Sequence, residues 1–462
     1  MYLRGLMLER TAQLSEALEA YQQALEHDYN SPLLHVRVGA TYVKLGQPEQ
    51  ALKSFERALA LDRSQQDALR WMAMLYASQG QLQEAIEIYE RLRKQEPTDR
   101  FVLSTLADLY VLQGELERAV ELFGQLIQEY GPSHQLHFNV GVLYGRMGRL
   151  SEAIQELSRA VELSPESVET RVALGLTYEL AEQPDKAVAH YEEAMRFDPL
   201  NPRVYQLAAR VYVNQERFAK AIQSYQTVLD LVPNDLSALV GLVRLLVAEK
   251  RFEEAQHLLT MKLRTLGQSS DLYLLLGLLY RAANHPYEAV RAFERAIVLQ
   301  PDAPQAHFCL GAQLEQLDQG EEARKAFRRT IQLEPNHADA LNYLGYMDAE
   351  AGVNLHEAKA LIERALALDP DNGAYVDSLG WACYQLGQLD QAVHHLERAT
   401  QLIDSDPTVF DHLGDVYLKQ GNLEGAERAW QKALELDETL DEVKYKLDSL
   451  QERRATVSTP SR

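Results

Sequence analysis

The stretch SDLYLLLGLLYRAANHPYEAVRAFERAIVLQPDA, residues 270–303, decides the fold of this chain. Gly277 lies in its first helical run, Ala289 lies twelve positions later in the second, and Phe293 follows four positions after that. A small residue in each helix lets the two helices cross closely, while Phe293 fills the space between successive hairpins. Pro301 disfavours helix at the residue before it and starts the next turn. The stretch therefore predicts a helical hairpin of about 34 residues.

The same pattern recurs along the whole chain. The small residues, broken only by Val243, are Gly5, Gly39, Ala73, Ala107, Gly141, Gly175, Ala209, Gly277, Gly311, Gly345, Gly380 and Gly414. The alanines that follow them are Ala17, Ala51, Ala85, Ala119, Ala153, Ala187, Ala221, Ala255, Ala289, Ala323, Ala358, Ala392 and Ala426. The prolines near the ends of second helices are Pro97, Pro165, Pro199, Pro233, Pro301, Pro335 and Pro370. Only a repeat array explains so many hairpins in one register.

This register predicts an all-α fold, a right-handed α-solenoid of about thirteen hairpins closed by a C-terminal capping helix. The expected parts are a partial first repeat at 1–31, repeats 2–8 at 32–269, repeats 9–13 at 270–440, a capping helix at 441–454 and a disordered tail at 455–462. One residue is inserted around Val353-Asn354-Leu355. Repeat 236–269 is the most degenerate, and we expect a flexible joint there.

The N-terminus carries no cap, because Met1 falls inside the first helix of the first repeat. We therefore expect that residues upstream of Met1 are missing from this sequence. The uncapped hairpin would expose an apolar edge, so self-association through that edge is an open alternative.

Composition limits the class of partner. The chain is 46% hydrophobic and 25% charged, with a formal net charge of −22. Such a negative charge argues against binding to nucleic acid or to anionic lipid. No stretch approaches the ~20 apolar residues of a membrane span, so no direct membrane insertion is expected. Cys309 and Cys383 lie two repeats apart, too far for a disulfide, and are interpreted as small buried apolar residues.

A search for catalytic and cofactor motifs finds none of the usual phosphate-binding, dinucleotide, zinc, calcium or nucleophile patterns. His356-Glu357 lacks the second histidine of a zinc helix, and His394-His395 point in different directions from adjacent helical positions. We therefore predict no metal, no cofactor and no enzymatic activity.

The whole chain resembles the tetratricopeptide repeat (TPR) family. Within it, Asn342–Met347, Asp369–Trp381 and Phe410–Asp415 are similar to the C-terminal repeats of bacterial TPR lipoproteins of the outer membrane. Among these is the lipoprotein that binds and activates a periplasmic C-terminal processing protease and delivers cell-wall hydrolases to it. The resemblance implies a protein-binding adaptor that is periplasmic and associated with the outer membrane through a lipoprotein signal upstream of this sequence.

Two alternatives remain open for the role. One is a cytoplasmic scaffold, and the other is an assembly factor of a secretion, pilus or polysaccharide export machine. A further comparison, with TPR cochaperones that grip a C-terminal carboxylate, is disfavoured because their set of lysines and asparagines is not found in three successive repeats.

The partner is expected in the concave groove, which positions 5, 9 and 12 of each first helix face. In the first half of the chain, these and nearby positions give an apolar floor suited to an extended or helical peptide. The floor consists of Val36, Val43, Phe101, Phe138, Val142, Val172 and Leu176. The alternative is that these side chains only pack neighbouring helices together.

In the middle of the chain, the stripe turns basic, with Arg203, Arg210, Arg244 and Arg281. Because arginine grips carboxylates in a bidentate manner, we expect these side chains to receive an acidic segment or a C-terminus of the partner. The alternative is pairing with nearby acids such as Glu216, Glu249 or Asp271.

The last three first helices carry aromatic, amide and carboxylate groups on one surface. They are Asn342, Tyr346, Asp377, Trp381, Tyr384, Asp411 and Asp415. This composition is typical of an interaction hot spot and suits a basic or amide-rich partner segment. The alternative is that the aromatic side chains pack on the neighbouring helix as additional core.

Overall fold

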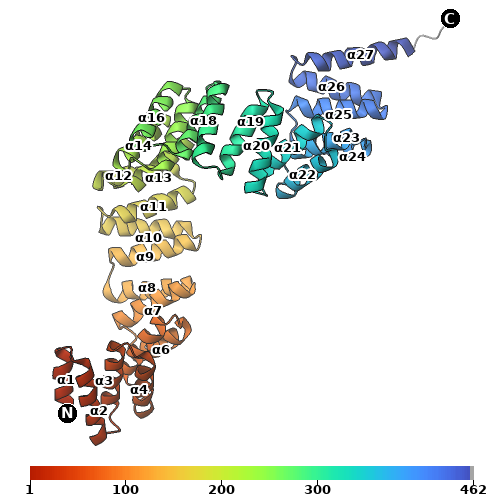
Figure 1. Ribbon diagram of the computed structural model, residues 1–462. Coiled ribbons are helices and arrows are strands. Elements are labelled where there is room, and N and C mark those ends of the chain that lie inside the picture. The colour runs from red at the N-terminus through yellow and green to blue at the C-terminus, as the bar shows by residue number, and fades with distance from the viewer. Residues whose placement is uncertain (458–462) are drawn as a thin grey trace. The chain divides into compact units, whose positions relative to one another are not determined.

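A computed structural model describes the backbone of residues 1–457 and the side chains of residues 1–451. In that part of the chain the secondary structure consists of 27 α-helices and no strand. Contacts divide the chain into two units, unit 1 from Met1 to Pro233 and unit 2 from Asn234 onward. Figure 1 labels the helices. The predicted all-α fold is confirmed.

Unit 1 contains seven hairpins, each made of an odd-numbered helix A and an even-numbered helix B. Its helices are α1 (Tyr2–Arg10), α2 (Leu14–His27), α3 (Pro32–Lys44), α4 (Pro48–Leu61), α5 (Gln66–Ser78), α6 (Leu82–Gln95), α7 (Arg100–Gln113), α8 (Leu116–Tyr130), α9 (His134–Arg146), α10 (Leu150–Leu163), α11 (Val168–Leu180), α12 (Pro184–Phe197), α13 (Pro202–Asn214) and α14 (Phe218–Leu231).

Unit 2 contains six hairpins and a last single helix. Its helices are α15 (Leu236–Ala248), α16 (Phe252–Thr265), α17 (Ser270–Ala282), α18 (Pro286–Leu299), α19 (Pro304–Glu315), α20 (Gly320–Leu333), α21 (Ala338–Glu350), α22 (Leu355–Leu368), α23 (Gly373–Gln385), α24 (Leu389–Leu402), α25 (Pro407–Gln420), α26 (Leu423–Leu436) and α27 (Asp441–Val457).

The capping helix is therefore longer than the predicted 441–454. Residues 458–462 of the predicted tail lie outside the described residues.

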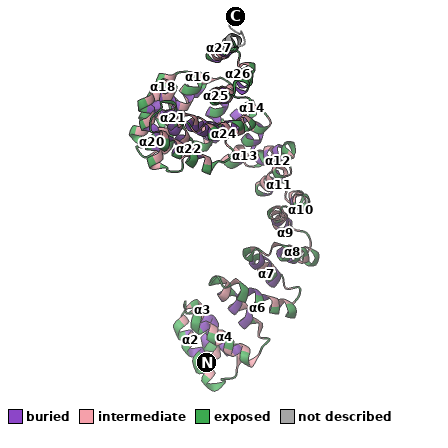
Figure 2. Cartoon of the chain, turned by 90° about the vertical axis from the view of Figure 1, so that its right-hand side faces the viewer, coloured by how far each residue is buried: buried purple, intermediate pink, exposed green. Residues whose placement is uncertain are grey.

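In the hairpins that carry a glycine at the small-residue position, that glycine allows the two helices to cross closely. A Cβ atom added to Gly39 would lie 2.5 Å from Cε1 of Phe55, and one added to Gly311 would lie 2.8 Å from Cε1 of Phe327. Each ring is fully buried and comes from helix B, sixteen positions after the glycine. The buried residues, purple in Figure 2, lie on helix faces turned toward neighbouring helices. The glycine and the ring are thus one packing unit.

The turn from helix A to helix B holds a residue in the left-handed region in every hairpin. These residues are Ala12, Gly46, Gly80, Gly114, Gly148, Glu182, Glu216, Lys250, Asn284, Asp318, Gly352, Gly387 and Gly421. The predicted insertion appears in the α21–α22 turn, where Asn354 is a second left-handed residue after Gly352. The turn geometry repeats with the same period as the hairpin core.

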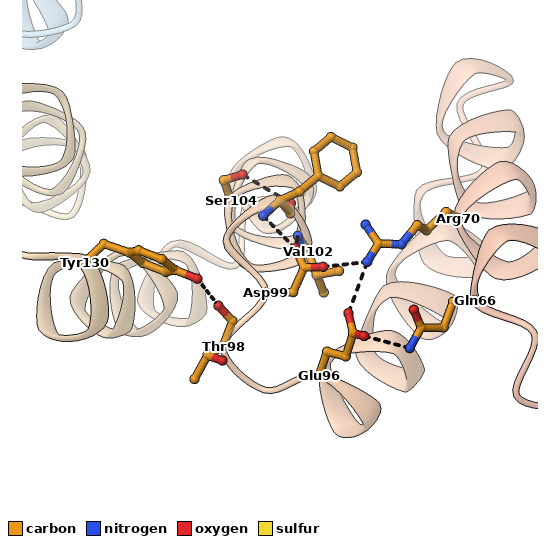
Figure 3. A network of polar contacts seen from close by, with 9 residues as sticks. Gln66, Arg70, Glu96, Thr98, Asp99, Val102, Ser104 and Tyr130 are labelled. Atoms are coloured by element: carbon orange, nitrogen blue, oxygen red, sulfur yellow. Dashed lines mark hydrogen bonds and ion pairs between the residues drawn. The ribbon is translucent and has the colours of Figure 1, made fainter.

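Successive hairpins are joined by polar contacts as well as by apolar contacts. In unit 1, Nη2 of Arg70 on α5 donates to Asp99 at 2.5 Å and to Glu96 at 3.2 Å, both in the segment between α6 and α7 (Figure 3). Asp99 also caps α7, because its Oδ1 accepts from the backbone N–H groups of Phe101 and Val102. The carboxylate of Asp99 therefore both binds Arg70 of the preceding hairpin and caps the first helix of the next one.

Repeat 236–269 differs from the others as its sequence predicts. Val243, which replaces the small residue, is buried, and the position sixteen residues later on α16 is the fully buried Leu259. The division between the two units falls at Pro233 and Asn234, just before α15. Flexibility at this repeat stays a prediction.

Candidate functional site

In unit 1, three neighbouring helices A form a hollow over the predicted apolar floor. The hollow has a volume of about 520 Å³. Its lining consists of Phe138 from α9, Val168, Glu169, Val172, Ala173 and Leu176 from α11, Asp198 and Asn201 from the following connection, and Arg203 and Val204 from α13. The structure thus brings together Phe138, Val172 and Leu176, as predicted, with the first of the predicted arginines at their rim.

The remaining residues of the predicted floor lie elsewhere. Val36 is buried in the core around α3 to α8, which contradicts its assignment to the groove, because its side chain is only 3% exposed. Val43 is half-buried against the same core. Phe101 is 48% exposed and lies under the guanidinium of Arg70, 6.0 Å from its ring centre. Val142 is half-buried and does not line the hollow.

The two arginines of unit 1 are in different states. Arg203 is exposed, and its guanidinium makes no hydrogen bond or ion pair with any described residue. Arg210 donates through Nη2 to both carboxylate oxygens of Glu179 on α11, at 3.1 and 3.0 Å. Glu179 also accepts from the buried Tyr191 hydroxyl at 2.5 Å, and burial together with this bond raises the pKa of Tyr191. The partner of Arg210 is thus Glu179, not one of the acids expected from the sequence.

The other two arginines belong to unit 2. Arg244 on α15 and Arg281 on α17 are exposed, and neither forms an ion pair within the described residues. Both remain available cations in that unit. The predicted basic stripe is divided between the two units, and the structure describes each pair only within its own unit.

The predicted C-terminal surface comes from three neighbouring helices A of unit 2. Asn342 and Tyr346 lie on α21, while Asp377, Trp381 and Tyr384 lie on α23. Asp411 and Asp415 lie on α25. A cavity of about 160 Å³ opens between these helices, lined by Asn342, Tyr343, Tyr346, Ala374, Asp377, Ser378, Ile403, Asp406, Thr408, Val409 and His412.

His412, which the sequence analysis did not single out, organises this surface. Its Nδ1 donates to both carboxylate oxygens of Asp377 at 3.0 Å. Its ring stacks on Trp381 with centroids 4.3 Å apart. Burial opposes the charge on His412, but the Asp377 carboxylate, with Asp411 and Asp415 nearby, outweighs it and raises the pKa of His412. Asp377 is accordingly a buried ion-pair partner rather than an open groove carboxylate.

Trp381 also packs more tightly than a free hot-spot residue would. It is half-buried, stacks on His412 from the next helix A, and lies 4.9 Å from the ring centre of Tyr384. Its indole Nε1 is buried and has no hydrogen-bond partner among the described residues. Trp381 thus packs against the neighbouring helix A, which is the arrangement named as the alternative for the aromatic residues. Whether this surface binds a partner stays a prediction.

The last two predicted carboxylates are engaged by the closing helix. Lys446 on α27 donates to Asp411 at 2.8 and 3.0 Å and to Asp415 at 2.9 Å. Burial opposes the charge on Lys446, but the two carboxylates raise its pKa. The sequence held a signal for both missed residues, because Asp377 and His412, like Asp411 and Lys446, are 35 positions apart. A separation of one repeat plus one residue therefore brings together side chains on α23 and α25, and on α25 and α27.

Other expectations concern groups outside the groove. Cys309 and Cys383 are free thiols and buried, as predicted, and burial raises the pKa of both. His394 is exposed, whereas His395 is half-buried with an unpartnered Nδ1. Within the described residues, no group of three or more potential ligands is placed to hold a metal ion. None of the described helices combines the length and apolar character that a bilayer crossing requires.

Comparison with known families gives one consistent answer. Several tetratricopeptide repeat models match the chain, at residues 42–102, 76–137, 133–199, 212–279 and 407–440. Two further models of the same repeat type match at 274–318 and 380–421. Together these matches cover more than half of the chain.

A curated relative is a TPR repeat-containing protein of Pseudomonas aeruginosa, 41% identical over 80 residues. That match spans 17% of this chain and 13% of the relative's own length. Among solved structures, the chain is similar to the Naa15/Naa10 complex bound to HypK (16% identity, TM-score 0.48, covering 99% of this chain and 78% of that one). It is also similar to Cut9–Hcn1 of the APC/C (14% identity, TM-score 0.43, covering 92% and 93%).

Proposed function

The chain belongs to the tetratricopeptide repeat proteins, and we propose that it is a non-catalytic scaffold that holds segments of partner proteins. The observation that carries this proposal is the hollow of unit 1, where an apolar floor from α9 and α11 meets the unpaired Arg203 on α13. The hollow combines an apolar floor with the polar groups Glu169, Asp198, Asn201 and Arg203, a composition that is common in binding sites.

The chemistry of the hollow favours a particular kind of segment. Phe138, Val172 and Leu176 offer an apolar surface for a large side chain of the partner. Arg203 offers an unpaired guanidinium for a carboxylate near that side chain. Arg210 contributes less, because Glu179 already satisfies it. The preferred segment therefore carries a bulky apolar residue close to an acidic residue or a free C-terminus.

Site-specific photocrosslinking in cells tests this assignment. A photoreactive phenylalanine analogue at Val172 is expected to capture a discrete protein partner. The same analogue at Leu112 on α7, which is 70% exposed and does not line the hollow, serves as the control and should capture no such partner.

Substitution of the two arginines separates binding from structure. Arg203→Glu should abolish the Val172 adduct without changing the melting temperature, whereas Arg210→Glu should lower the melting temperature because it places a second charge against Glu179. Equal adducts at Val172 and Leu112, or an adduct that survives Arg203→Glu, would show that the hollow is not the binding site.

The finer role proposed is that of a periplasmic protease adaptor, and it rests on the resemblance of residues 342–415 to outer-membrane TPR lipoproteins. Copurification of a C-terminal processing protease, with faster cleavage of a cell-wall hydrolase when the chain is added, would support it. Copurification of export or pilus components instead would favour the assembly-factor role, and cell fractionation would assign the compartment.

Binding to nucleic acid is not part of the proposal, because the net charge of −22 opposes a phosphate backbone. Self-association stays an alternative that the sedimentation of the purified chain would decide.

A further inference from the structure

A second cavity of unit 2, about 320 Å³ in volume, lies where the capping helix α27 meets the last hairpins, at the C-terminal end of Figure 1. It combines aromatic rings, aliphatic side chains and one ion pair. Its lining consists of Tyr384 from α23, Asp415 and Leu418 from α25, Trp430 from α26, and Tyr445, Lys446, Ser449 and Leu450 from α27. Apolar walls with a few polar groups are the usual composition of a ligand site.

Asp415 is the charged group of this cavity that is incompletely compensated. Nζ of Lys446 binds both carboxylate oxygens of Asp411, at 2.8 and 3.0 Å, but only Oδ2 of Asp415, at 2.9 Å. Burial raises the pKa of Asp415, and the hydrogen bond from Lys446 lowers it without cancelling the rise. The pKa of Lys446 is itself raised, because its two carboxylates outweigh its burial. The shortage of positive charge is therefore on the side of the carboxylates.

The ion-pair network around the cavity gives the same result. It joins Asp377 to His412, and it joins Asp411 and Asp415 to Lys446, so that three carboxylates meet two cations. Even when His412 is protonated, this network keeps one unbalanced negative charge. A ligand group that enters the cavity beside it is favoured when it carries a positive charge.

The tyrosines of the lining distinguish between the basic side chains. Tyr445 is 73% exposed, so a ligand can cover its ring. Burial and the nearby Asp415 carboxylate raise the pKa of Tyr384, which places its hydroxyl beside the charged pair. Arginine stacks on aromatic faces and has several N–H donors and no acceptor. A guanidinium thus matches a lining of tyrosine rings, hydroxyls and a carboxylate better than a compact ammonium does.

We propose that this cavity binds the side chain of an arginine in a partner segment. The guanidinium covers the ring of Tyr445 and donates to Oδ1 of Asp415, which Lys446 leaves unused. Lys446 stays in place, because Asp411 holds it through both oxygens. The aliphatic part of the arginine packs on the leucines of the lining. The partner being a protein rests on the scaffold function, but the recognition chemistry does not depend on the unit 1 hollow.

A titration of the full chain with three small probes tests the proposal. The probes are the N-acetyl methylamides of arginine, citrulline and glutamate, and citrulline keeps the shape of arginine without its charge. The indole N–H signals report binding, because the chain has only three tryptophans, Trp71, Trp381 and Trp430. Trp430 lines the cavity, whereas Trp71 belongs to unit 1 and is the internal reference. The Trp71→Phe and Trp381→Phe variants assign the signals.

The arginine probe is expected to shift the Trp430 signal along a saturable curve while the Trp71 signal stays in place. Citrulline and glutamate should bind at least about tenfold more weakly, one decade in the dissociation constant. An equal response to citrulline would show that the cavity does not recognise the charge. A preference for glutamate would assign the cavity to anions through Lys446. Either result, or no saturable response to the arginine probe, would overturn the proposal.

Two substitutions in the lining sharpen the test. Asp415→Asn keeps the size of the side chain and an oxygen for Lys446, but it removes the charge and should weaken arginine binding at least about tenfold. Tyr445→Ala removes an exposed ring, so it should weaken binding by about threefold and leave the melting temperature unchanged.

Asp448→Asn and Tyr287→Ala are the matched controls, because both residues are exposed and neither lines the cavity. Both variants should bind the arginine probe as the wild type does. Equal losses in Asp448→Asn and Asp415→Asn would reveal general attraction to an acidic surface and would overturn the proposal. Unchanged arginine binding in both Asp415→Asn and Tyr445→Ala would also contradict it, while the crosslinking test of unit 1 would be unaffected.

Discussion

At the scale of single residues, the hairpin is defined by contacts between one small residue and one large one. Gly311 on α19 faces Phe327 on α20 so closely that a Cβ atom would lie 2.8 Å from the ring. Val243 and Leu259 occupy the equivalent positions of α15 and α16, and both side chains are buried. Interiors are packed densely enough that a mismatch in either member is felt.

We therefore expect Gly311→Val to destabilise the α19–α20 hairpin by about 3 kcal/mol or more, because the ring of Phe327 has no free volume into which to move. The double variant Gly311→Val/Phe327→Leu reproduces the Val243–Leu259 pair and should recover a large part of that loss. Amide hydrogen exchange of α19 and α20 measures both effects. Additive losses in the double variant would mean that the two residues do not form one packing unit.

The hairpin turns allow a second prediction at this scale. Glu182 has φ 55° and Asn284 has φ 59°, both in the left-handed region. This region costs a non-glycine residue roughly 1 kcal/mol, while asparagine tolerates it better. Glu182→Gly should therefore stabilise the α11–α12 hairpin by about 0.5 kcal/mol, net of the entropy that glycine loses on folding. Asn284→Gly is the control and should change stability less, as read from the same exchange measurement in α17 and α18.

At the scale of helices, polar pairs connect several helices A to the next one. Asp377 on α23 and His412 on α25 form such a pair. Lys446 on α27 forms ion pairs with Asp411 and Asp415 on α25. These bonds are buried or half-buried, so breaking one side leaves an unpaired charge inside the structure. The C-terminal end of unit 2 therefore depends on protonation of His412.

This dependence predicts how stability changes with pH. The pKa of His412 is raised in the folded protein above the ordinary value of about 6.5, so the ion pair contributes fully below that pH. The contribution is lost as the pH rises through the raised folded pKa. The melting temperature of the α23–α27 region should fall over that range.

Asp377→Asn should lower the melting temperature near pH 6.5 and remove the decline above it, because burial then keeps His412 neutral. The exposed His394 provides a control, and His394→Gln should keep the wild-type pH profile. An unchanged profile in Asp377→Asn would show that His412 does not titrate in this way.

At the scale of the whole molecule, stability is distributed among neighbouring hairpins rather than concentrated in one core. Separate buried clusters follow one another along each unit, as those around Tyr21, Phe293 and Trp430 do. In arrays of this kind, local opening follows the stability of each repeat and its interfaces. The degenerate repeat 236–269, which is the first hairpin of unit 2, is then the place where that unit should open first.

Hydrogen exchange across the chain tests this expectation. α16 buries only Ala255 and Leu259, whereas α10, of equal length, buries Ala153, Leu157 and Ala160. Amides of α16 should exchange about tenfold faster than those of α10, which corresponds to a difference of about 1.4 kcal/mol in local opening. The double variant Val243→Gly/Leu259→Phe restores the common pair and should slow exchange in α16. Equal protection in the two helices of the wild type would reject the flexible joint.

The sequence by itself determined the periodic features, because each of them depends on residues close together along the chain. The recurrence, about every 34 residues, of the positions held by Gly277, Ala289 and Phe293 was enough to predict the hairpin, its boundaries and the all-α array. The same register placed Phe138, Val172 and Leu176 on a common surface, and the structure confirms that they line one hollow.

Only the tertiary structure decided which groove groups are free to bind. Arg203 and Arg210 look equivalent in the sequence, yet only Arg210 is held by Glu179, and Asp377 and Trp381 are engaged by His412. The physical reason is that a helical period fixes the face on which a side chain lies, whereas pairing depends on distances between helices from different repeats. Side chains of that kind meet only after the hairpins stack, so their partners are a property of the packed array.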